Sequence, residues 1–389
     1  MKPYPKYKPS DIQWLGDIPE HWEVKKIRHL SPVKRGASPR PIDNPIYFDE
    51  NGEFSWVRIA DVTASDRYLE NTTQKLSDLG ASLSVKRYPN DFFLSIAGSV
   101  GKPIITKIKC CIHDGFVWFP ELKINPEYLF YLFSTGLPYQ GLGKMGTQLN
   151  LNTDTVADIT LPIPPIDEIE AVIQYLDQKT AQIDTLIAQK QRLITLLKEE
   201  RMAFVNEILS NKSFPLKKLK YVVSLKSGSG ITSEVIRAEG QYPVFGGNGL
   251  RGFYSNFTHD GEYILIGRQG ALCGNINYTT GKFWASEHAI VVTILDNSDM
   301  KWLGELLRVM NLNQYSVAAA QPGLSVENII NLKIPYPSIT KQIEISKLIR
   351  KTTSKIDATL AKIVQEIELL KEYRVALISE VVTGKISVI

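Results

Sequence analysis

The sequence predicts an α+β protein made by internal duplication, with two β-rich globular domains and two long helices forming an antiparallel coiled coil with pseudo-twofold symmetry. One observation is that LLKEERMAF (196–204) recurs as LLKEYRVAL (369–377), at an offset of 369 − 196 = 173 residues. Another is that each copy ends a segment of about 40 residues with apolar residues at heptad spacing and no internal proline or glycine, a pattern typical of coiled coils. The remaining sequence alternates short strand-like runs with turn residues.

The duplication continues outside the two helices. LPIP (161–164) aligns with IPYP (334–337) at the same offset of 173, whereas VKKI (24–27) aligns with LKKL (216–219) at 216 − 24 = 192. The first copy therefore holds about 19 additional residues between residues 30 and 98, an insertion of the kind that loops absorb. These alignments predict a first globular domain at 1–160, a long helix at 161–212, a second globular domain at 213–332 and a second long helix at 333–389.

Local patterns predict the elements of each globular domain. Apolar and β-branched runs bounded by turn residues predict strands at 55–62, 91–99, 111–119, 242–247, 262–267 and 289–295. Asn125-Pro126 and Asp299 are favourable starts for helices at 125–136 and 299–311. FGGNG (245–249) is expected to form a glycine-rich hairpin or a DNA-facing loop, and Gly384 is expected to end the second long helix.

Composition sets limits on the kind of protein. The chain has 389 residues, a formal net charge of +4 and three cysteines without CxxC spacing, which argues against a disulfide scaffold and a zinc site. No apolar run reaches the roughly 18 residues of a membrane helix. We therefore expect a cytoplasmic protein without a membrane partner.

The sequence contains no convincing motif for a catalytic or metal site. FGGNG and NPIY (44–47) partly fit the cofactor and target-base motifs of adenine methyltransferases, but they occur in the wrong order and in different copies. GSVGKP (98–103) lacks residues that a phosphate-binding P-loop needs. Asp114, Glu121 and Lys123 resemble a nuclease pattern that the second copy does not keep. The sequence therefore predicts a binding protein.

Two similar modules joined by long helices suit a target with two separated recognition points, such as a DNA sequence split into two half-sites. The modules differ widely outside the repeated segments, so each could bind a different half-site. An adaptor whose modules bind proteins or sugars is the main alternative, and a self-sufficient methyltransferase is a weaker one.

The repeated segments resemble those of the specificity subunits of type I restriction-modification enzymes, over essentially the whole chain. The resemblance is carried by WLGDIPEHWEVKKI (14–27), the proline-rich entry and I-D-x-L-I core of 161–204, and LLKEYRVALISEVVTGKI (369–386). The chain departs from the family pattern at Ile169, where glutamine usually follows glutamate, and at Ile349-Arg350, where the family has Leu-Asp.

The resemblance implies that each globular half is a target recognition domain reading one part of a bipartite double-stranded DNA sequence, with the helices setting the half-site spacing. It also implies docking of two methyltransferase subunits, which use S-adenosylmethionine to methylate adenine N6. Motor-nuclease subunits that use ATP and Mg²⁺ would complete a restriction complex for phage defence. This subunit would have no catalytic site, cofactor or metal of its own.

Residue chemistry suggests which side chains face DNA, since arginine suits guanine and asparagine or glutamine suits adenine. The predicted DNA-binding residues of the first half are Lys34, Arg35, Arg58, Ser99, Lys102, Lys144, Thr147 and Gln148. Those of the second half are Lys226, Ser229, Asn248, Arg251, Arg268, Gln269 and Gln321. For partner docking, the repetition of charge suggests Glu199, Arg201, Glu372 and Arg374, although intrachain ion pairs are the alternative.

Overall fold

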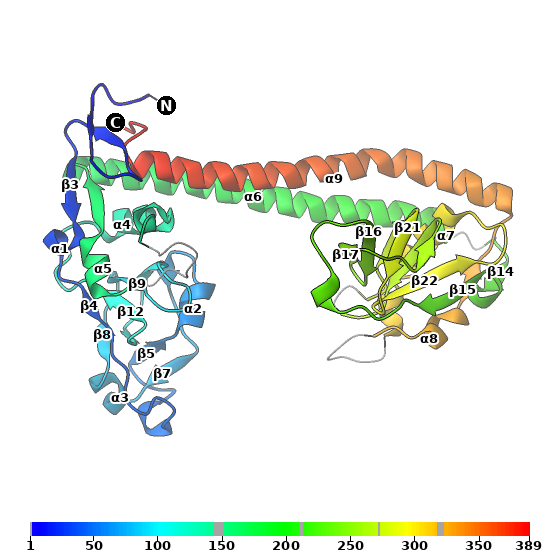
Figure 1. The fold of residues 1–389 in the computed structure, drawn as a ribbon, viewed down its shortest axis with the longest axis horizontal. Helices are drawn as coiled ribbons and strands as arrows, with labels where there is room; N and C mark the ends of the chain where they lie inside the picture. The colour runs from blue at the N-terminus through cyan, green and yellow to red at the C-terminus, as the bar shows by residue number, and fades with distance from the viewer. Residues whose placement is uncertain (1, 143–150, 211–212, 271–272, 317–322) are drawn as a thin grey trace. The chain divides into compact units, whose positions relative to one another are not determined.

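A computed structural model describes residues 2–142, 151–210, 213–270, 273–316 and 323–389. The chain forms two compact units, one made of residues 1–188 with 366–389 and the other of residues 189–365. Each unit contains one β-rich module and part of both long helices, α6 (Ile166–Leu209) and α9 (Ile339–Val382) (Figure 1). The α+β class, the duplication and the two long helices are confirmed.

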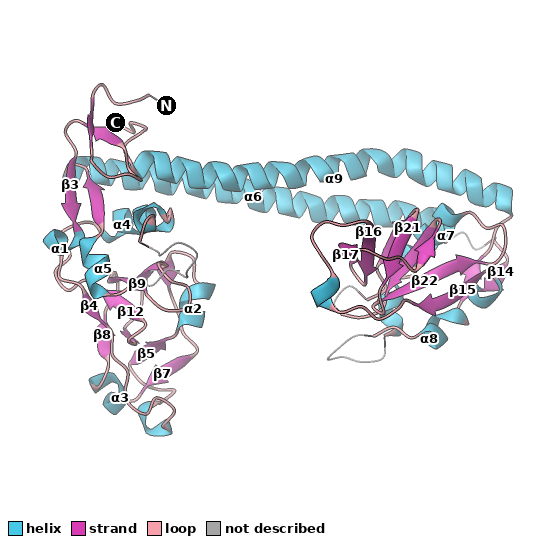
Figure 2. Cartoon of the chain, viewed as in Figure 1, coloured by secondary structure: helices cyan, strands magenta, loops and turns pink. Residues whose placement is uncertain are grey.

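The described residues of the first module, 23–163, form two sheets of four or more strands with short helices around them (Figure 2). Its larger sheet has the order β4 (Lys34–Arg35), β12 (Phe116–Trp118), β9 (Phe92–Ser95), β10 (Pro103–Thr106) and β6 (Tyr68–Leu69). Its smaller sheet has the order β7 (Gln74–Leu76), β5 (Phe54–Val57), β11 (Cys110–Ile112) and β8 (Val85–Arg87). The helices are α1 (Ile27–Leu30), α2 (Ile59–Ala64), α3 (Asp78–Ser82), α4 (Pro126–Ser134) and α5 (Thr153–Asp158), with short 3-10 turns at Pro45–Tyr47 and Leu137–Tyr139.

The second module, residues 216–335, repeats this topology, except that its described residues include no counterpart of β6. One sheet has the order β15 (Val223–Ser227), β22 (Ala289–Ile294), β19 (Tyr263–Gly267) and β20 (Ile276–Thr279). The other has the order β17 (Gly249–Tyr254), β16 (Tyr242–Gly246), β21 (Lys282–Ala285) and β18 (His259–Asp260). Helices α7 (Met300–Val309) and α8 (Val326–Ile330) follow, and 3-10 turns occupy Leu219–Tyr221, Ser233–Val235 and Leu312–Tyr315.

Strand registers show the duplication in three dimensions. Lys34 pairs with Trp118 in the first module, and Lys226 pairs with Val291 in the second. These are the same positions under the offsets of 192 and 173 found in the sequence. Each module also begins and ends on one two-stranded ladder, β3 (Glu23–Lys26) with β13 (Thr160–Ile163) or β14 (Leu216–Lys218) with β23 (Lys333–Pro335).

The predicted helix starts are confirmed, because the side chains of Asn125 and Asp299 accept hydrogen bonds from backbone amides in the first turns of α4 and α7. Gly384 adopts φ +72° just beyond α9, as expected of a residue that ends a helix. FGGNG forms the predicted hairpin between β16 and β17.

Two predicted strands are wrong in part. The segment 55–62 holds the end of β5 and then starts α2, because Asp61 accepts a hydrogen bond from the Arg58 amide and so favours a helical turn there. The segment 111–119 contains two strands in different sheets, β11 and β12, separated by the turn at residues 113–115. Apolar periodicity alone did not locate that turn.

In each unit α6 and α9 run antiparallel. Within the first unit, Ile169, Val172 and Leu176 of α6 share a core with Leu377 and Val381 of α9. The N-terminal ladder of β1 (Tyr7–Pro9) and β2 (Asp17–Pro19) belongs to the same unit, and Lys2 pairs with Ser387. The N and C labels accordingly lie near each other in Figure 1.

Candidate nucleic-acid interface

In both modules a glycine follows the first strand, β4 or β15, at the point where the chain leaves the sheet. Gly36 and Gly228 follow β4 and β15, and a Cβ atom at either would lie 2.1–2.3 Å from backbone carbonyl oxygens of the turn opposite. The amide of Gly36 donates to Phe116 O, and that of Gly228 donates to Ala289 O, the equivalent residue. We call this region the glycine edge, defined as residues 36–40 with 113–115 in the first module and 228–231 with 286–288 in the second.

In the first module, the glycine edge is organised around the Asp114 carboxylate. Arg40 Nη2 donates to Asp114 Oδ2 at 3.0 Å, and Ser38 Oγ donates to Asp114 Oδ1 at 3.3 Å. Arg35 donates to the backbone carbonyl of the same aspartate. The neighbouring His113 accepts a hydrogen bond from the Gly115 amide at Nδ1, and burial lowers the His113 pKa.

In the second module, Glu287 stands at the equivalent position. Its Oε2 accepts from the Ile231 amide at 3.2 Å, and its Oε1 lies 3.2 Å from His288 Nε2. Arg268 Nη1 lies 3.5 Å from the Glu287 carbonyl oxygen, and the Arg268 amide donates to His288 O. Gly247 of the hairpin approaches the carbonyls of Gln269 and His288, so hairpin, turn and strand end meet at one edge.

Several predicted DNA-binding residues lie on or beside the glycine edge. Arg268 and Gln269 follow β19, Asn248 is exposed in the adjacent hairpin turn, and an added Cβ on Gly246 would come close to Arg251. Ser229 is exposed within the edge itself. The structure thus brings together five residues that sequence reasoning selected separately.

Other predicted positions are more dispersed. Lys34 and Arg35 of β4 and Lys226 of β15 are exposed beside the edge. Arg58 precedes α2 and donates to Thr73 Oγ1, and Ser99 Oγ lies 2.7 Å from Thr63 Oγ1. Lys144, Thr147, Gln148 and Gln321 lie outside the described residues.

Lys102 is held by its own module. Its ammonium group donates to the carbonyl oxygens of Thr63, at 3.0 Å, and Ser65, at 2.5 Å, where α2 ends. Burial lowers the Lys102 pKa. A lysine at a helix C-terminus also interacts favourably with the helix dipole, so this side chain has a structural role in the free protein.

The charges suggested for partner docking fall into two groups. Arg374 Nε donates to Asp184 at 2.9 Å in the first unit, and Arg201 Nε donates to Asp357 at 2.9 Å in the second. The two contacts are equivalent with the roles of α6 and α9 exchanged, since Arg374 matches Arg201 and Asp184 matches Asp357 at the repeat offset of 173. Arg201 also donates to Glu305 of α7 at 3.3 Å. Sequence reasoning named the arginines but missed Asp184 and Asp357 as their partners, although both aspartates are repeated in the sequence.

Glu199 and Glu372, the other two residues suggested for docking, differ from these arginines in having no partner within the described chain. Both are exposed and, among the described residues, neither makes a hydrogen bond or ion pair. Leu196 and Leu369, one helical turn earlier, are 48% and 54% exposed. The repeated segment thus presents an apolar residue and a carboxylate to solvent in each unit.

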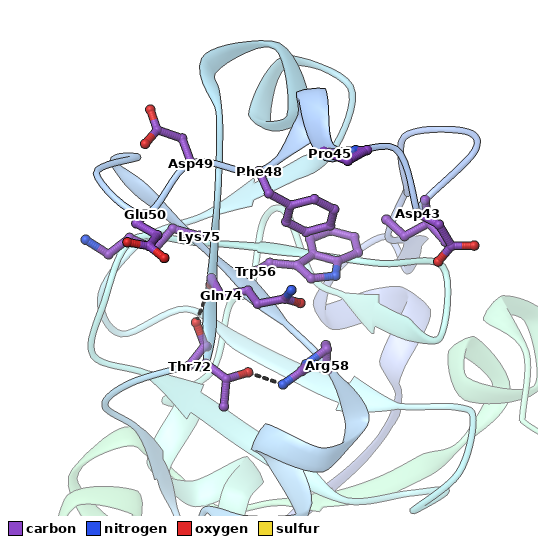
Figure 3. A pocket seen from close by; sticks show the side chains of 12 residues that line it. Asp43, Pro45, Phe48, Asp49, Glu50, Trp56, Arg58, Thr72, Gln74 and Lys75 are labelled. Atoms are coloured by element: carbon purple, nitrogen blue, oxygen red, sulfur yellow. Dashed lines mark hydrogen bonds between the residues drawn. The ribbon is translucent and has the colours of Figure 1, made fainter.

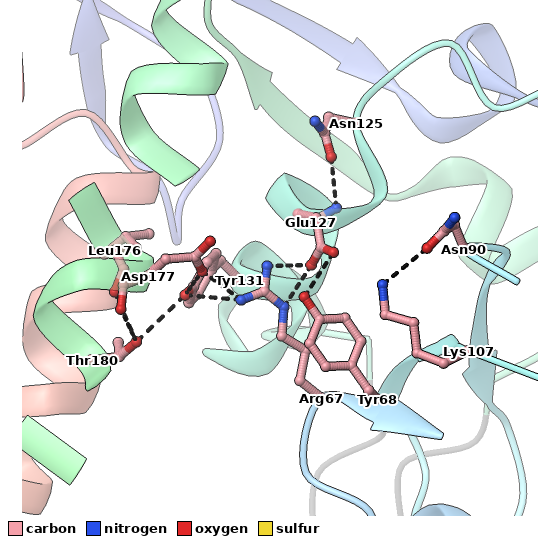
Figure 4. Close-up of polar contacts among 10 residues, drawn as sticks. All are labelled: Arg67, Tyr68, Asn90, Lys107, Asn125, Glu127, Tyr131, Leu176, Asp177 and Thr180. Atoms are coloured by element: carbon pink, nitrogen blue, oxygen red, sulfur yellow. Dashed lines mark hydrogen bonds and ion pairs between the residues drawn. The ribbon is translucent and has the colours of Figure 1, made fainter. Parts of the chain in front are cut away.

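Arg67 links the first module to its part of α6 (Figure 4). Its guanidinium donates to Glu127 of α4 and to Asp177 of α6, each at 2.5 Å, and to the Tyr131 hydroxyl at 3.2 Å. The guanidinium also lies 4.7 Å from the centre of the Tyr131 ring. With its side chain only 14% exposed, Arg67 fixes α4 against α6. The sequence contained no repeated signal for this residue.

A cavity of about 1020 Å³ opens in the inserted part of the first module (Figure 3). Trp56, Phe48 and Pro45 form an apolar wall, and Arg58 and Gln74 provide polar groups. Trp56 is only 4% exposed, so its ring belongs mainly to the core. No cluster of three or more histidine, cysteine or acidic residues suited to a metal ion occurs among the residues that the structure describes.

Comparisons with known proteins place these features in a family. The family model described as type I restriction modification DNA specificity domain matches twice, at residues 19–196 and 211–369. The chain is a member of this specificity-subunit family. It is 30% identical to the type I restriction enzyme EcoprrI specificity subunit of Escherichia coli, over 88% of this chain and 90% of that protein. It is 22% identical to the MjaIX specificity subunit of Methanocaldococcus jannaschii, over 98% and 96%.

Solved structures agree with the fold of a type I specificity subunit. A chain from a type I R-M system superposes with a TM-score of 0.70 at 14% identity, over 95% of this chain and 99% of that one. The HsdS subunit from Thermoanaerobacter tengcongensis gives 0.50 at 15% identity, over 97% and 100%. Within the described residues, no helix is long and apolar enough to span a membrane.

Proposed function

We propose that this specificity subunit reads a bipartite, asymmetric DNA sequence, with one module on each half-site, and directs adenine-N6 methylation and ATP-dependent restriction by partner subunits. The main support for this proposal is the glycine edge, where both modules have the same backbone contacts but different side chains. A shared scaffold with different polar groups is what two different base sequences require.

The second module shows this difference most clearly. Arg268 and Gln269 follow β19, whereas Ile96 and Ala97 follow the corresponding strand, β9. Ile96 and Arg268 occupy equivalent positions, because the backbone amide of Ile96 donates to Gly115 O and that of Arg268 donates to the equivalent His288 O. Arginine and glutamine can each pair with a purine through two hydrogen bonds. The two modules therefore offer different chemistry at one structural position.

Partner docking is assigned to the exposed residues Leu196 and Glu199 in one unit and Leu369 and Glu372 in the other. Two equivalent surfaces suit two copies of one methyltransferase subunit. Arg201 and Arg374 are better explained as bonds between the helices, because each already pairs with an aspartate of the opposite helix. The partners, and not this chain, would bind S-adenosylmethionine, ATP and Mg²⁺, and the assembly would work in the cytoplasm.

Methylome sequencing of cells that express this chain with its methyltransferase tests the proposal. A split motif, methylated at adenine in both halves, is expected. An Arg268→Ala variant should relax the half-site of the second module by about 1–3 kcal/mol of discrimination and leave the other half unchanged. Methylation of a continuous motif, or none above that of the methyltransferase alone, would contradict the assignment.

The adaptor alternative makes a different prediction. Binding to a duplex through phosphate contacts weakens steeply as salt concentration rises, whereas binding of an apolar protein surface does not. Titration of the purified complex with its duplex at 50 and 200 mM salt separates the two functions. A self-sufficient methyltransferase would instead bind S-adenosylmethionine as an isolated chain, which calorimetry measures directly.

A further inference from the structure

Each glycine edge contains one carboxylate at the same position of the repeat, Asp114 in the first module and Glu287 in the second. Both lie in the turn that receives the close approach of Gly36 or Gly228. Their side chains are 42% and 37% exposed. A carboxylate at an edge assigned to DNA is unexpected, since phosphate groups repel it.

Stability does not explain the two carboxylates well. Arg40, the ion-pair partner of Asp114, has a side chain that is 75% exposed. Exposed pairs of this kind contribute little to folding, typically below about 1 kcal/mol. Among the described residues, the partners of the Glu287 carboxylate are a partly exposed histidine and one backbone amide. The two residues therefore contribute little to the folding of their modules.

Each oxygen of the two carboxylates has a partner in its own module. Asp114 Oδ1 accepts from Ser38 and Oδ2 from Arg40. Glu287 Oε1 lies against His288, and Oε2 accepts from the Ile231 amide. These contacts use about two of the roughly four lone pairs of a carboxylate, so they hold the side chain in place. Direct reading of a cytosine amino group through a remaining lone pair is one outcome that the test below distinguishes. In both modules the partners include the segment just beyond the glycine, residues 38–40 or 231.

We propose that Asp114 and Glu287 are positioning residues for sequence recognition. Each carboxylate ties the segment that leaves the sheet, 37–40 or 229–231, to the turn opposite, and so fixes the loop that meets one half-site. This inference rests on the proposed DNA-reading function and adds to it the residues that hold the two reading loops. Phosphate repulsion is tolerated because each carboxylate is satisfied by donors of its own module.

The test uses the full complex of this chain with its methyltransferase and compares wild type with Asp114→Asn and Glu287→Gln. Each variant should lower discrimination at one half-site about tenfold, the effect of losing a hydrogen bond to a charged group, and leave the other half-site intact. Affinity for a non-specific duplex should stay equal or rise, because a negative charge has been removed. A merely structural role would instead lower specific and non-specific binding together.

The matched control variants remove one negative charge from a glutamate that makes no hydrogen bond or ion pair within the described chain. Glu50 and Glu239 are exposed and have no hydrogen bond or ion pair among the described residues, so Glu50→Gln and Glu239→Gln should keep the wild-type motif. Ser38→Ala should reproduce the Asp114→Asn defect in weaker form, and Asp114→Glu should restore part of the discrimination.

The outcomes separate the two proposals. If wild type methylates no split motif, the proposed function fails. If wild type methylates a split motif but Asp114→Asn and Glu287→Gln leave both half-sites unchanged, or weaken both together, the positioning role is overturned. Selective loss of cytosine at one position, without wider relaxation of that half-site, would also overturn it, since this outcome indicates direct base reading.

Discussion

Replacing Arg67 by methionine should destabilise the first unit far more than the same change at Arg374. Arg67 is 14% exposed and holds two carboxylates, of which Glu127 is 23% and Asp177 is 47% exposed. Breaking a fully buried pair costs about 3–5 kcal/mol. The exposure of Asp177, and the hydrogen bond that Tyr68 still donates to Glu127 at 2.9 Å, lower the expected cost to about 3 kcal/mol.

Arg374 provides the comparison in the same unit. It is 29% exposed, and its ion-pair partner within the described chain is Asp184, which is 51% exposed, so its loss should cost below about 1 kcal/mol. The first unit contains 188 + 24 = 212 residues. In a unit of this size 1 kcal/mol corresponds to a change in melting temperature of about 2–4 °C. We therefore expect decreases of roughly 6–12 °C for Arg67→Met and at most about 4 °C for Arg374→Met.

Differential scanning calorimetry of the purified chain measures both changes. Arg201→Met serves as a marker for the other unit, because Arg201 pairs with Glu305 and Asp357 there. Arg67→Met should shift a transition that Arg201→Met leaves in place. Equal shifts for Arg67→Met and Arg374→Met, or a shift confined to the Arg201-dependent transition, would refute the reasoning.

Three further results are expected. Gly228→Ala should destabilise the second unit by about 1–3 kcal/mol, because the new methyl group meets rigid carbonyls; Gly230→Ala, with open space around it, should have little effect in the same denaturant titration. Lowering the pH should destabilise the first unit through His113, whose pKa is lowered by burial: the loss begins as the pH falls past the ordinary value of about 6.5 and is complete below the lowered pKa. His113→Asn, which keeps an acceptor for the Gly115 amide, should flatten that pH dependence, and an unchanged slope would exclude His113 as its source. Glu199→Lys or Glu372→Lys should each leave one methyltransferase bound and the double variant none, as measured by native mass spectrometry; full binding by the double variant would show that docking lies elsewhere.

The repeated parts of the fold could be predicted from sequence because they carry two copies of the same signal. The offsets 173 and 192 reappear as strand registers, such as Leu161 with Lys25 and Ile334 with Lys217. The two long helices were likewise evident from heptads, and their observed length of 44 residues is close to expectation.

The candidate site was only partly predictable, because single copies and side-chain direction leave no such signal. Arg67 lies in the part of the first module that has the extra residues, so no second copy marked it. The charge of Lys102 predicts a DNA contact, whereas the direction of its side chain toward the end of α2 is set by the tertiary fold and has no signal in the sequence. The aspartate partners of Arg201 and Arg374 lie 156 and 190 positions away along the chain. Identifying them requires the register in which the two helices pair, and the sequence alone does not give that register.

The division of the chain into units has a consequence for synthesis. The first unit includes residues 366–389, and Leu377, Ile378, Val381 and Val382 complete its core, whereas the second unit consists of residues 189–365. The ribosome synthesises the chain from its N-terminus, so the first unit begins to form before the second but is completed after it. Until then the apolar face of the first half of α6, with Val172 and Leu176, lacks its α9 partner. A nascent or prematurely terminated chain should therefore be recognised by chaperones and proteases through its first unit.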